Sequence, residues 1–197
     1  MKKSSLLLLL AALAFGPIAT AQANDTYKID PVHSSISFKV RHFFSYVTGN
    51  FKKFEGTIEV DPDHPEKSSV TATIDVASID TKNENRDEDL RSDHFFDVTK
   101  YPTITFKGKS VKQTGPDSGD VIGDLTMHGV TKEITLHVKF LGKGKGMGEK
   151  SISGWQVTPE PIKRSEYGLN WSKMVDGTAV VGEEVTIAID VEADKAP

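Results

Sequence analysis

Apolar and polar residues alternate along most of the chain, and the alternation recurs at the spacing of β-hairpins. Within residues 35–41, Ile36, Phe38 and Val40 are apolar and their neighbours are polar or charged. A strand with this pattern presents one apolar and one polar face. The same alternation predicts further strands at residues 54–60, 70–76, 104–106, 121–127, 134–140 and 185–191.

Turn-forming residues separate these strands, as at 61–63, 114–119 and 128–129. Weaker strand patterns lie near residues 27–29 and 151–157. Because each strand has one apolar face, the sheet must close or double so that these faces meet. We therefore expect an all-β fold with one or two short helices, in which the strands form an antiparallel barrel of about eight strands.

Two segments depart from the strand pattern. Residues 83–97 begin with a strongly acidic stretch and predict a short helix, with Asp87 and Arg91 spaced i,i+4 on one face. The glycine-rich segment 142–148 lies between two predicted antiparallel strands, whereas a phosphate-binding loop joins a strand to a helix N-terminus. This segment is interpreted as a flexible hairpin loop, with a lid at the barrel mouth as its functional alternative.

The first 23 residues have the three regions of a secretory signal peptide. Lys2 and Lys3 give a basic start, residues 6–15 form an apolar run, and Ala21 to Ala23 match a small-x-small cleavage site. No later segment approaches the roughly 18 uncharged residues that a transmembrane helix needs. We expect a cleaved signal peptide over residues 1–23 and a single periplasmic domain over residues 24–197.

Composition excludes several classes of function. The chain has no cysteine, which excludes disulfide frameworks, thiolate metal sites and thiol nucleophiles. The net charge of −4 becomes about −6 without Lys2 and Lys3. Because nucleic acids and anionic membranes attract proteins of the opposite charge, we expect no nucleic-acid partner.

The six histidines show no metal-binding motif, since none lies in an H-E-x-x-H or H-x-x-E-H spacing, and no metal site is expected. His42 shares the parity of Val40, which predicts an inward side chain, either as a hydrogen-bonded core residue or as a contact for a ligand head group. His137 alternates with apolar neighbours and should face solvent. No catalytic constellation is recognisable.

Three arginines lie close to acidic residues in short motifs. Their main interpretation is structural, as ion pairs within the fold, and their alternative is contact with a ligand head group. The arginines are Arg86, Arg91 and Arg164, and the predicted partners are Asp87, Asp93 and Glu166.

Several motifs occur in a consistent order along nearly all of the chain after residue 23. Residues 32–42 contain H-S-x-I-x-F-x-V-x-H and residues 49–56 contain G-x-F-x-x-F-x-G. Similar signatures follow at 79–106, 123–132, 162–171 and 181–185. Together these motifs resemble the YceI-like family of bacterial periplasmic lipocalin-like lipid-binding proteins.

The chain departs from the pattern of that family at three places. Asp89 stands where the family usually has a histidine, and His94 where it usually has an acid. Residues 153–161 follow the usual strand pattern poorly, because Pro159 and Pro161 interrupt it. These departures concern local ion pairs and ligand selectivity near the helix, and the expected fold is unchanged.

The resemblance implies a lipocalin-like antiparallel barrel whose elongated apolar cavity holds a polyisoprenoid, an isoprenoid quinone or another long amphiphile, such as a fatty lipid. It implies transport or storage without covalent chemistry, no enzyme activity, and no cofactor apart from the bound lipid. Arg86, Asp87, Arg91 and Arg164 would orient a head group or hold the barrel shut. The candidate ligand-binding residues, chosen by the parity of the alternation, are Ile36, Phe38, Val40, His42, Phe51, Phe54, Ile58, Ile74, Phe95, Phe96, Ile104, Phe106, Leu125, Leu136, Val138, Phe140, Trp171 and Ile187.

Three alternatives remain open at the level of sequence. An outer-membrane barrel would need aromatic girdles and a polar lumen, whereas aromatic residues are 8% of this chain and its C-terminus is charged. A small periplasmic enzyme would use His42 or His94 as its acid–base group. A stress-related protein-interaction module would use the exposed helix from Asn83. Pairing of two barrels as a homodimer is also open.

Overall fold

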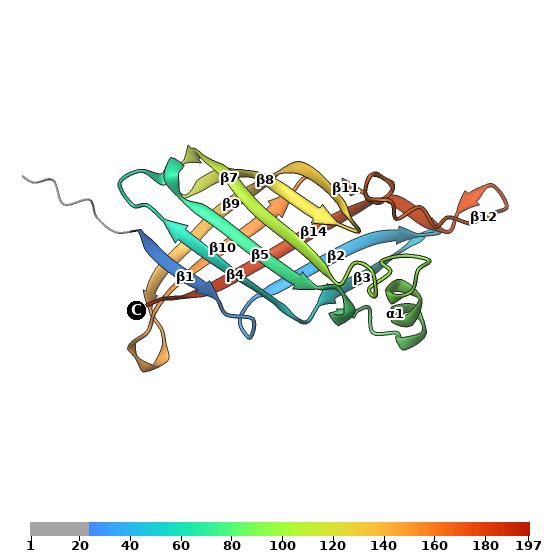
Figure 1. Ribbon diagram of the computed structural model, residues 1–197, viewed down its shortest axis with the longest axis horizontal. Helices are drawn as coiled ribbons and strands as arrows, with labels where there is room; N and C mark the ends of the chain where they lie inside the picture. Colours follow the sequence, from blue (N-terminus) through green and yellow to red (C-terminus); the bar gives the residue numbers. More distant parts are fainter. Residues whose placement is uncertain (1–23) are drawn as a thin grey trace, which may run out of the picture.

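Eight strands form a closed antiparallel barrel in the computed structural model, which describes residues 24–197 (Figure 1). Neighbouring strands follow the order β1, β4, β5, β7, β8, β9, β10 and β14, and β14 pairs with β1 to close the ring. The predicted all-β barrel of about eight strands is confirmed. The strands are Asp25–Ile29, Phe54–Val60, Ser69–Asp75, Thr103–Gly115, Ser118–Met127, Val130–Lys145, Ser151–Pro159 and Val181–Lys195.

Strand β14 belongs to two parts of the sheet. Its C-terminal residues pair with β1, whereas residues 181–190 pair with β2 (Ser35–His42). Strand β3 (Ser45–Phe51) pairs with β2 and extends the sheet beyond the barrel. The last two residues of β3 pair with β6 (Ile79–Asp80). Because 15 extended residues span about 50 Å, β14 is long enough to serve both parts.

Shorter elements complete the fold. Strand β11 (Ile162–Lys163) pairs with β14, and the hairpin of β12 (Met174–Val175) and β13 (Thr178–Ala179) stands apart from the main sheet. Four 3₁₀ turns lie within the described residues: η1 (Pro65–Lys67), η2 (Val76–Ser78), η3 (Met147–Glu149) and η4 (Arg164–Tyr167). Within residues 24–197, no helix has both the length and the apolar character required to cross a bilayer.

Helix α1 (Glu84–Arg91) is shorter than the predicted helical segment 83–97. Asn83 is its N-cap, and the Asn83 side chain accepts a hydrogen bond from the backbone N–H of Arg86. After Arg91 the chain turns back, because the backbone N–H groups of Phe96 and Val98 bond to carbonyls of the last helical turn. Of the segment 153–161, residues up to Pro159 belong to the continuous strand β10, and the expected interruption is confined to residues 160–161 between β10 and β11.

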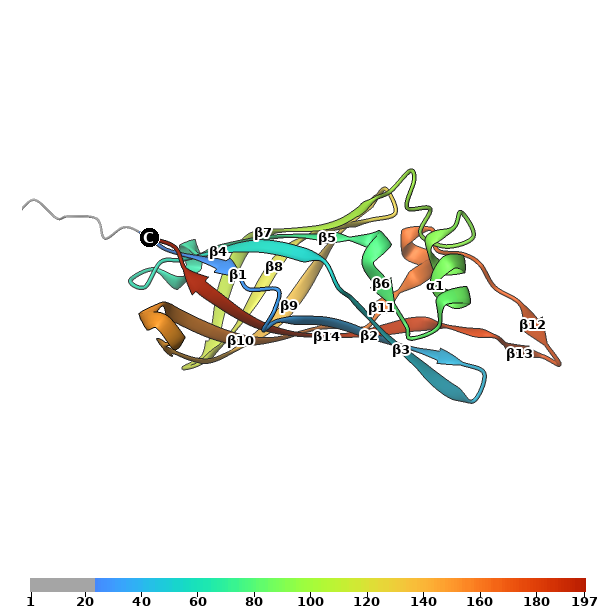
Figure 2. The ribbon, with the colours of Figure 1, turned by 90° about the horizontal axis from the view of Figure 1, so that it is seen from below.

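The two ends of the barrel differ (Figure 2). At the first end, called the mouth here, β4, β7, β9 and β14 finish and β1, β5, β8 and β10 begin. At the opposite end, called the closed end, lie α1 and η4. The largest fully buried side chains, Tyr167 and Val76, belong to the closed end, and Ile79 beside them is 3% exposed. Several bulky side chains are therefore packed together at the closed end as in an ordinary protein core.

Candidate functional site: an apolar cavity with one mouth

A cavity of about 660 Å³ occupies the interior of the barrel. Its volume falls within the range of roughly 300–1,000 Å³ that is usual for small-molecule pockets. All eight barrel strands line it, together with β2, the end of β3 and Leu90 of α1. The walls are almost wholly apolar, whereas the lumen of an outer-membrane barrel is polar.

The cavity reaches the surface at the mouth. Its lining there includes loop residues, namely Asp61 and Pro65 between β4 and β5, and Pro116 and Asp117 between β7 and β8. At the closed end, Phe95 and Phe96 after α1 line the cavity together with Arg164 and Leu169, whereas no residue of the loops 43–44, 97–102 and 128–129 does. The cavity is therefore an elongated tube that runs from the loops of the mouth to the side chains beneath α1 and η4.

The structure brings nearly all of the predicted apolar residues together around this cavity. Their contact with a ligand stays a prediction. Those that line the cavity are Ile36, Phe38, Val40, Phe51, Phe54, Ile58, Ile74, Phe95, Phe96, Ile104, Phe106, Leu125, Leu136, Val138, Phe140 and Ile187.

His42 and Trp171 do not line the cavity. His42 is the last residue of β2, beyond the irregular pairing of β14 between Val181 and Val185, and its ring packs edge-on against Phe43 with centroids 5.1 Å apart. The Trp171 ring lies against Phe95, with centroids 5.3 Å apart. The structure thus places His42 outside the cavity lining, although its cross-strand partner Val181 belongs to that lining.

Sequence alternation misses lining residues next to β-bulges. In β9, Gly142 faces Gly154 and Phe140 faces Trp155, so Leu141 is an extra residue with no partner. Leu141 points outward, and both Phe140 and Lys143 line the cavity although they differ in parity. A similar shift after Gly108 in β7 brings Val111 into the lining.

The polar residues of α1 hold the helix in place and lie outside the cavity lining. Asp87 is buried, and its carboxylate accepts hydrogen bonds from the backbone N–H of Thr81 at 2.9 and 3.1 Å and from the Thr81 hydroxyl. Arg86 donates to the same threonine, from Nε to the hydroxyl at 2.7 Å and from Nη2 to the carbonyl at 2.8 Å. Arg91 pairs with Glu84 at 2.6 Å. The partners predicted for Arg86 and Arg91 are therefore wrong, although the residues do serve the structure.

Arg164 begins η4 and lines the closed end of the cavity, with 6% of its surface exposed. Its guanidinium donates from Nε to the carbonyl of Gly182 at 2.9 Å, and from Nη1 to the carbonyls of Leu169 and Trp171 at 2.6 and 2.7 Å. The predicted pair with Glu166 does not form, because Glu166 bonds to Lys132 at 3.1 Å. Backbone carbonyls thus take the place of the expected carboxylate.

Tyr167 closes the same turn. Its side chain is 1% exposed, and its hydroxyl has no hydrogen-bond partner among the described residues. Burial raises the pKa of Tyr167, and the negative charge of Glu166 raises it further. The phenol therefore stays neutral and fills space in the core.

The two unusual residues near the helix interact with each other. His94 Nδ1 lies 2.9 Å from a carboxylate oxygen of Asp89. The hydrogen bond to Asp89 and the charge of that carboxylate raise the pKa of His94. The two positions at which the chain departs from the expected family signature are therefore in contact with each other.

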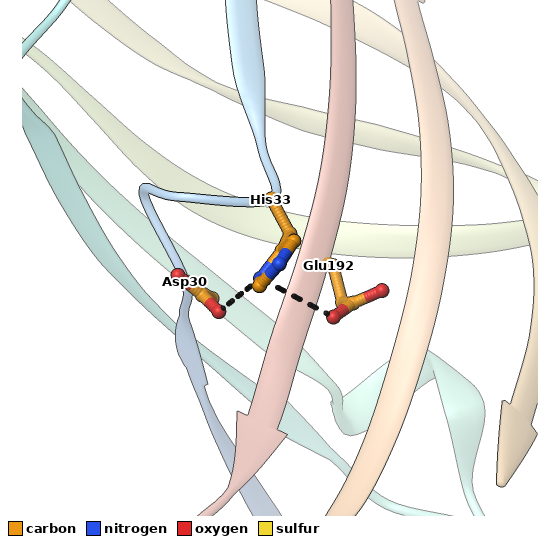
Figure 3. Close-up of side chains that lie close together, drawn as sticks. All are labelled: Asp30, His33 and Glu192. Carbon is orange, nitrogen blue, oxygen red and sulfur yellow. Dashed lines mark hydrogen bonds and ion pairs between the residues drawn. The ribbon is translucent and has the colours of Figure 1, made fainter. Parts of the chain in front are cut away.

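A second histidine lies between two carboxylates where β14 changes partner from β2 to β1 (Figure 3). His33 Nδ1 is 2.7 Å from Asp30 and 3.8 Å from Glu192, and the hydrogen bond to Asp30 raises the pKa of His33. Within residues 24–197 this group can offer three ligand atoms to a metal ion. The His33 side chain is 62% exposed and already bonded to Asp30, so the group links the β1–β2 turn to the barrel wall.

The family model described as the YceI-like domain matches residues 27–193. This chain belongs to the YceI-like family. It is 43% identical over 195 residues to Protein YceI of Shigella flexneri, and the alignment covers 98% of this chain and 97% of that protein. The family expected from the sequence motifs is confirmed.

Solved structures share the YceI-like fold. BcnA of Burkholderia cenocepacia has a TM-score of 0.74 and 26% sequence identity, over 83% of this chain and 98% of that one. A polyisoprenoid-binding domain from Saccharophagus degradans has a TM-score of 0.62 and 19% identity, over 86% of this chain and 98% of that one. At 19% identity, the second likeness shows the fold alone.

Proposed function

We propose that this protein binds one long-chain amphiphilic lipid, a polyisoprenoid or an isoprenoid quinone, inside the barrel and transports or stores it. The observation that carries the proposal is the elongated apolar tube, which all eight barrel strands line and which α1 and η4 cover at one end (Figure 2). The barrel of similar fold from Saccharophagus degradans is described as binding a polyisoprenoid. A tube closed at one end suits an elongated molecule that enters lengthwise.

Apolar contact alone supplies enough free energy for such a ligand. Burying one methylene group contributes about 0.8 kcal/mol, so forty carbons nominally contribute on the order of 30 kcal/mol. Non-covalent binding saturates near 18–21 kcal/mol, so ordering of the chain and partial burial must offset much of the nominal value. Apolar burial therefore supplies most of the affinity, and polar contacts add a smaller share while setting orientation and selectivity.

The site also supports binding without covalent chemistry. No histidine lines the cavity within residues 24–197, and the whole chain has no cysteine. His42 and His94, the acid–base residues of the enzyme hypothesis, both lie outside the lining. An acid–base reaction on a ligand inside the tube would have neither group in contact.

We infer that the protein acts in the periplasm as a single domain over residues 24–197. The expected signal peptide, residues 1–23, lies outside the described residues, and the inference rests on its sequence. Membership of the YceI-like family agrees with it. Pairing of two barrels stays a prediction.

Two neighbouring positions on β5 provide a test. Ala72 lines the cavity, and Thr71 faces solvent on the opposite side of the same strand. An Ala72→Trp substitution places an indole inside the tube, whereas Thr71→Trp adds the same group outside. Uptake of solanesol, a long isoprenoid alcohol, by lipid-extracted protein should fall at least about tenfold in Ala72→Trp, equivalent to about 1.4 kcal/mol.

Thr71→Trp is the matched control and should take up solanesol as the unmodified protein does. Circular dichroism establishes that both variants fold. Equal uptake by both folded variants would contradict binding inside the barrel.

A further inference from the structure

Arg164 is a buried cation at the closed end of an apolar tube. It is 6% exposed and belongs to the cavity lining, while the walls around it are almost entirely apolar. Leu169 and Ile162 line the same end. A charged group in such surroundings is costly unless its charge and all of its donors are satisfied.

The partners of Arg164 leave part of the guanidinium unused. A guanidinium has five N–H donors, and three of them, on Nε and Nη1, bond to backbone carbonyls. Within residues 24–197, Nη2 makes no hydrogen bond and no carboxylate lies within ion-pair distance of Arg164. The nearby acid Glu183 accepts hydrogen bonds from the hydroxyl and the backbone N–H of Ser165, which lower its pKa, and the charge of Arg164 lowers that pKa further. The cavity therefore ends at a guanidinium whose Nη2 still has N–H groups available to donate to a ligand.

We propose that Arg164 is the head-group contact of the ligand, and that the amphiphile lies head-first, with its polar end at the closed end and its tail toward the mouth. This rests on the proposed function, that is, on a lipid lying in the barrel. The recognised chemistry is an oxygen acceptor, such as a quinone carbonyl or a phosphate oxygen, and Nη2 donates to it. The three bonds to carbonyls fix the plane of the guanidinium before the ligand arrives.

The mouth is less suited to such a head group. Apart from Arg164, the charged side chains in the cavity lining are Asp25, Asp61, Asp117, Asp190 and Lys143. Carboxylates only accept hydrogen bonds, so they repel an oxygen acceptor, and Asp25 is already paired with Lys195 at 2.5 Å. These groups also face water, so a bond from the ligand would replace a bond to water with little net gain. A hydrogen bond from Arg164 to the ligand forms in dry surroundings at the closed end, so it contributes more net free energy to binding.

The chain has two tryptophans, and they report on the two ends. Trp155 lies in the mouth half, with its ring 5.6 Å from Tyr27 and 5.9 Å from Phe140 between centroids. Trp171 lies at the closed end, where its carbonyl accepts the bond from Arg164. A quinone ring quenches indole fluorescence at short range, so each tryptophan senses a head group at its own end.

The first experiment titrates decylubiquinone into lipid-extracted Trp155→Phe and Trp171→Phe proteins, with uptake measured in parallel by native mass spectrometry. Strong quenching in Trp155→Phe, which retains Trp171, with weak quenching in Trp171→Phe, is the expected result. The reverse pattern with normal uptake would overturn the head-first orientation and leave lipid binding intact. Failure of the unmodified protein to take up any isoprenoid would instead contradict the proposed function.

The second experiment separates a head-group contact from a purely structural role of Arg164. Arg164→Met and Arg164→Lys are compared for binding of geranylgeraniol, geranylgeranyl phosphate and squalene, a hydrocarbon without a head group. Arg164→Met should bind the oxygenated ligands at least about tenfold more weakly and squalene unchanged, with partial rescue in Arg164→Lys. A larger loss for the phosphate than for the alcohol would identify an anionic head group as the preferred one.

Equal loss for all three ligands would show a structural role and overturn the proposal. If the Arg164 variants do not fold, the fluorescence experiment still decides the orientation, because both tryptophan variants keep Arg164.

Discussion

The mouth and the closed end of the barrel are built from the same strands, but their side chains differ in packing and in exposure to solvent. At the closed end, Val76, Ile79 and Tyr167 are at most 3% exposed and α1 is tied to the sheet by buried hydrogen bonds. At the mouth, Met147 is 98% exposed and the ion pairs lie in solvent, as in Lys145 with Glu149. We therefore expect the packed side chains of the closed end to contribute more to stability than the exposed loops of the mouth.

The largest expected difference concerns apolar truncation. Ile79→Ala removes buried atoms from the closed end and should lower the free energy of unfolding by about 2–5 kcal/mol. Met147→Ala, at the mouth, should change it by no more than about 0.5 kcal/mol. Urea unfolding of both variants measures the contrast, and comparable losses would contradict the division between the two ends.

Polar substitutions should show the same contrast on a smaller scale. Asp87→Asn leaves one acceptor oxygen where Thr81 donates to two, and should cost about 1–3 kcal/mol because the group is buried. The matched change at the mouth, Glu149→Gln, removes only a solvent-exposed ion pair and should have no measurable effect. A loss for Glu149→Gln as large as that for Asp87→Asn would show that burial does not control the cost.

A third substitution at the closed end should act in the opposite direction. Tyr167→Phe removes a hydroxyl that is buried and has no hydrogen-bond partner among the described residues. Its removal should leave stability unchanged or raise it by about 1 kcal/mol, since the desolvation cost of the hydroxyl disappears. Thermal unfolding of the variant tests this. A clear loss of stability would mean that the hydroxyl bonds to a group such as a bound water.

The smallest effect is the response to pH. The pKa values of His33, His94 and His137 are all raised above the ordinary 6.5 by carboxylates, so each histidine contributes stability below pH 6.5 that is lost as the pH rises through its folded pKa. Unfolding should therefore become slightly easier from pH 6.5 upward. NMR titration of Asp89→Asn should return the pKa of His94 toward 6.5 and leave that of His137 unchanged. An unchanged His94 would contradict the assigned pair.

Alternation predicts the barrel because it reports a property of the whole strand. Residues such as Phe38 and Leu136 line the cavity because the strand pairing on either side of them is regular. The same argument fails at Leu141, where one extra residue changes the parity of everything that follows. It also fails for His42, which lies outside the lining although its cross-strand partner Val181 belongs to it. A pattern of residue types contains no signal for either event.

The polar part of the site depends on contacts that the sequence does not encode locally. Arg164 was expected to pair with an acid two positions away, but its partners are backbone carbonyls of residues 169, 171 and 182. Any residue type supplies a carbonyl, so no motif could identify them. The pair of Asp89 and His94 is visible in sequence only as two simultaneous departures from the family signature.

The central claim, that the barrel interior holds a lipid, is tested most directly by native mass spectrometry of the full chain expressed in a bacterial periplasm and purified without detergent. Spectra are recorded before and after extraction with organic solvent, and again after refilling with isoprenoids. We predict a stoichiometric hydrophobic adduct that extraction removes and refilling restores, and that the Ala72→Trp protein lacks. A protein that carries no adduct as purified and takes up no isoprenoid after extraction would contradict the claim.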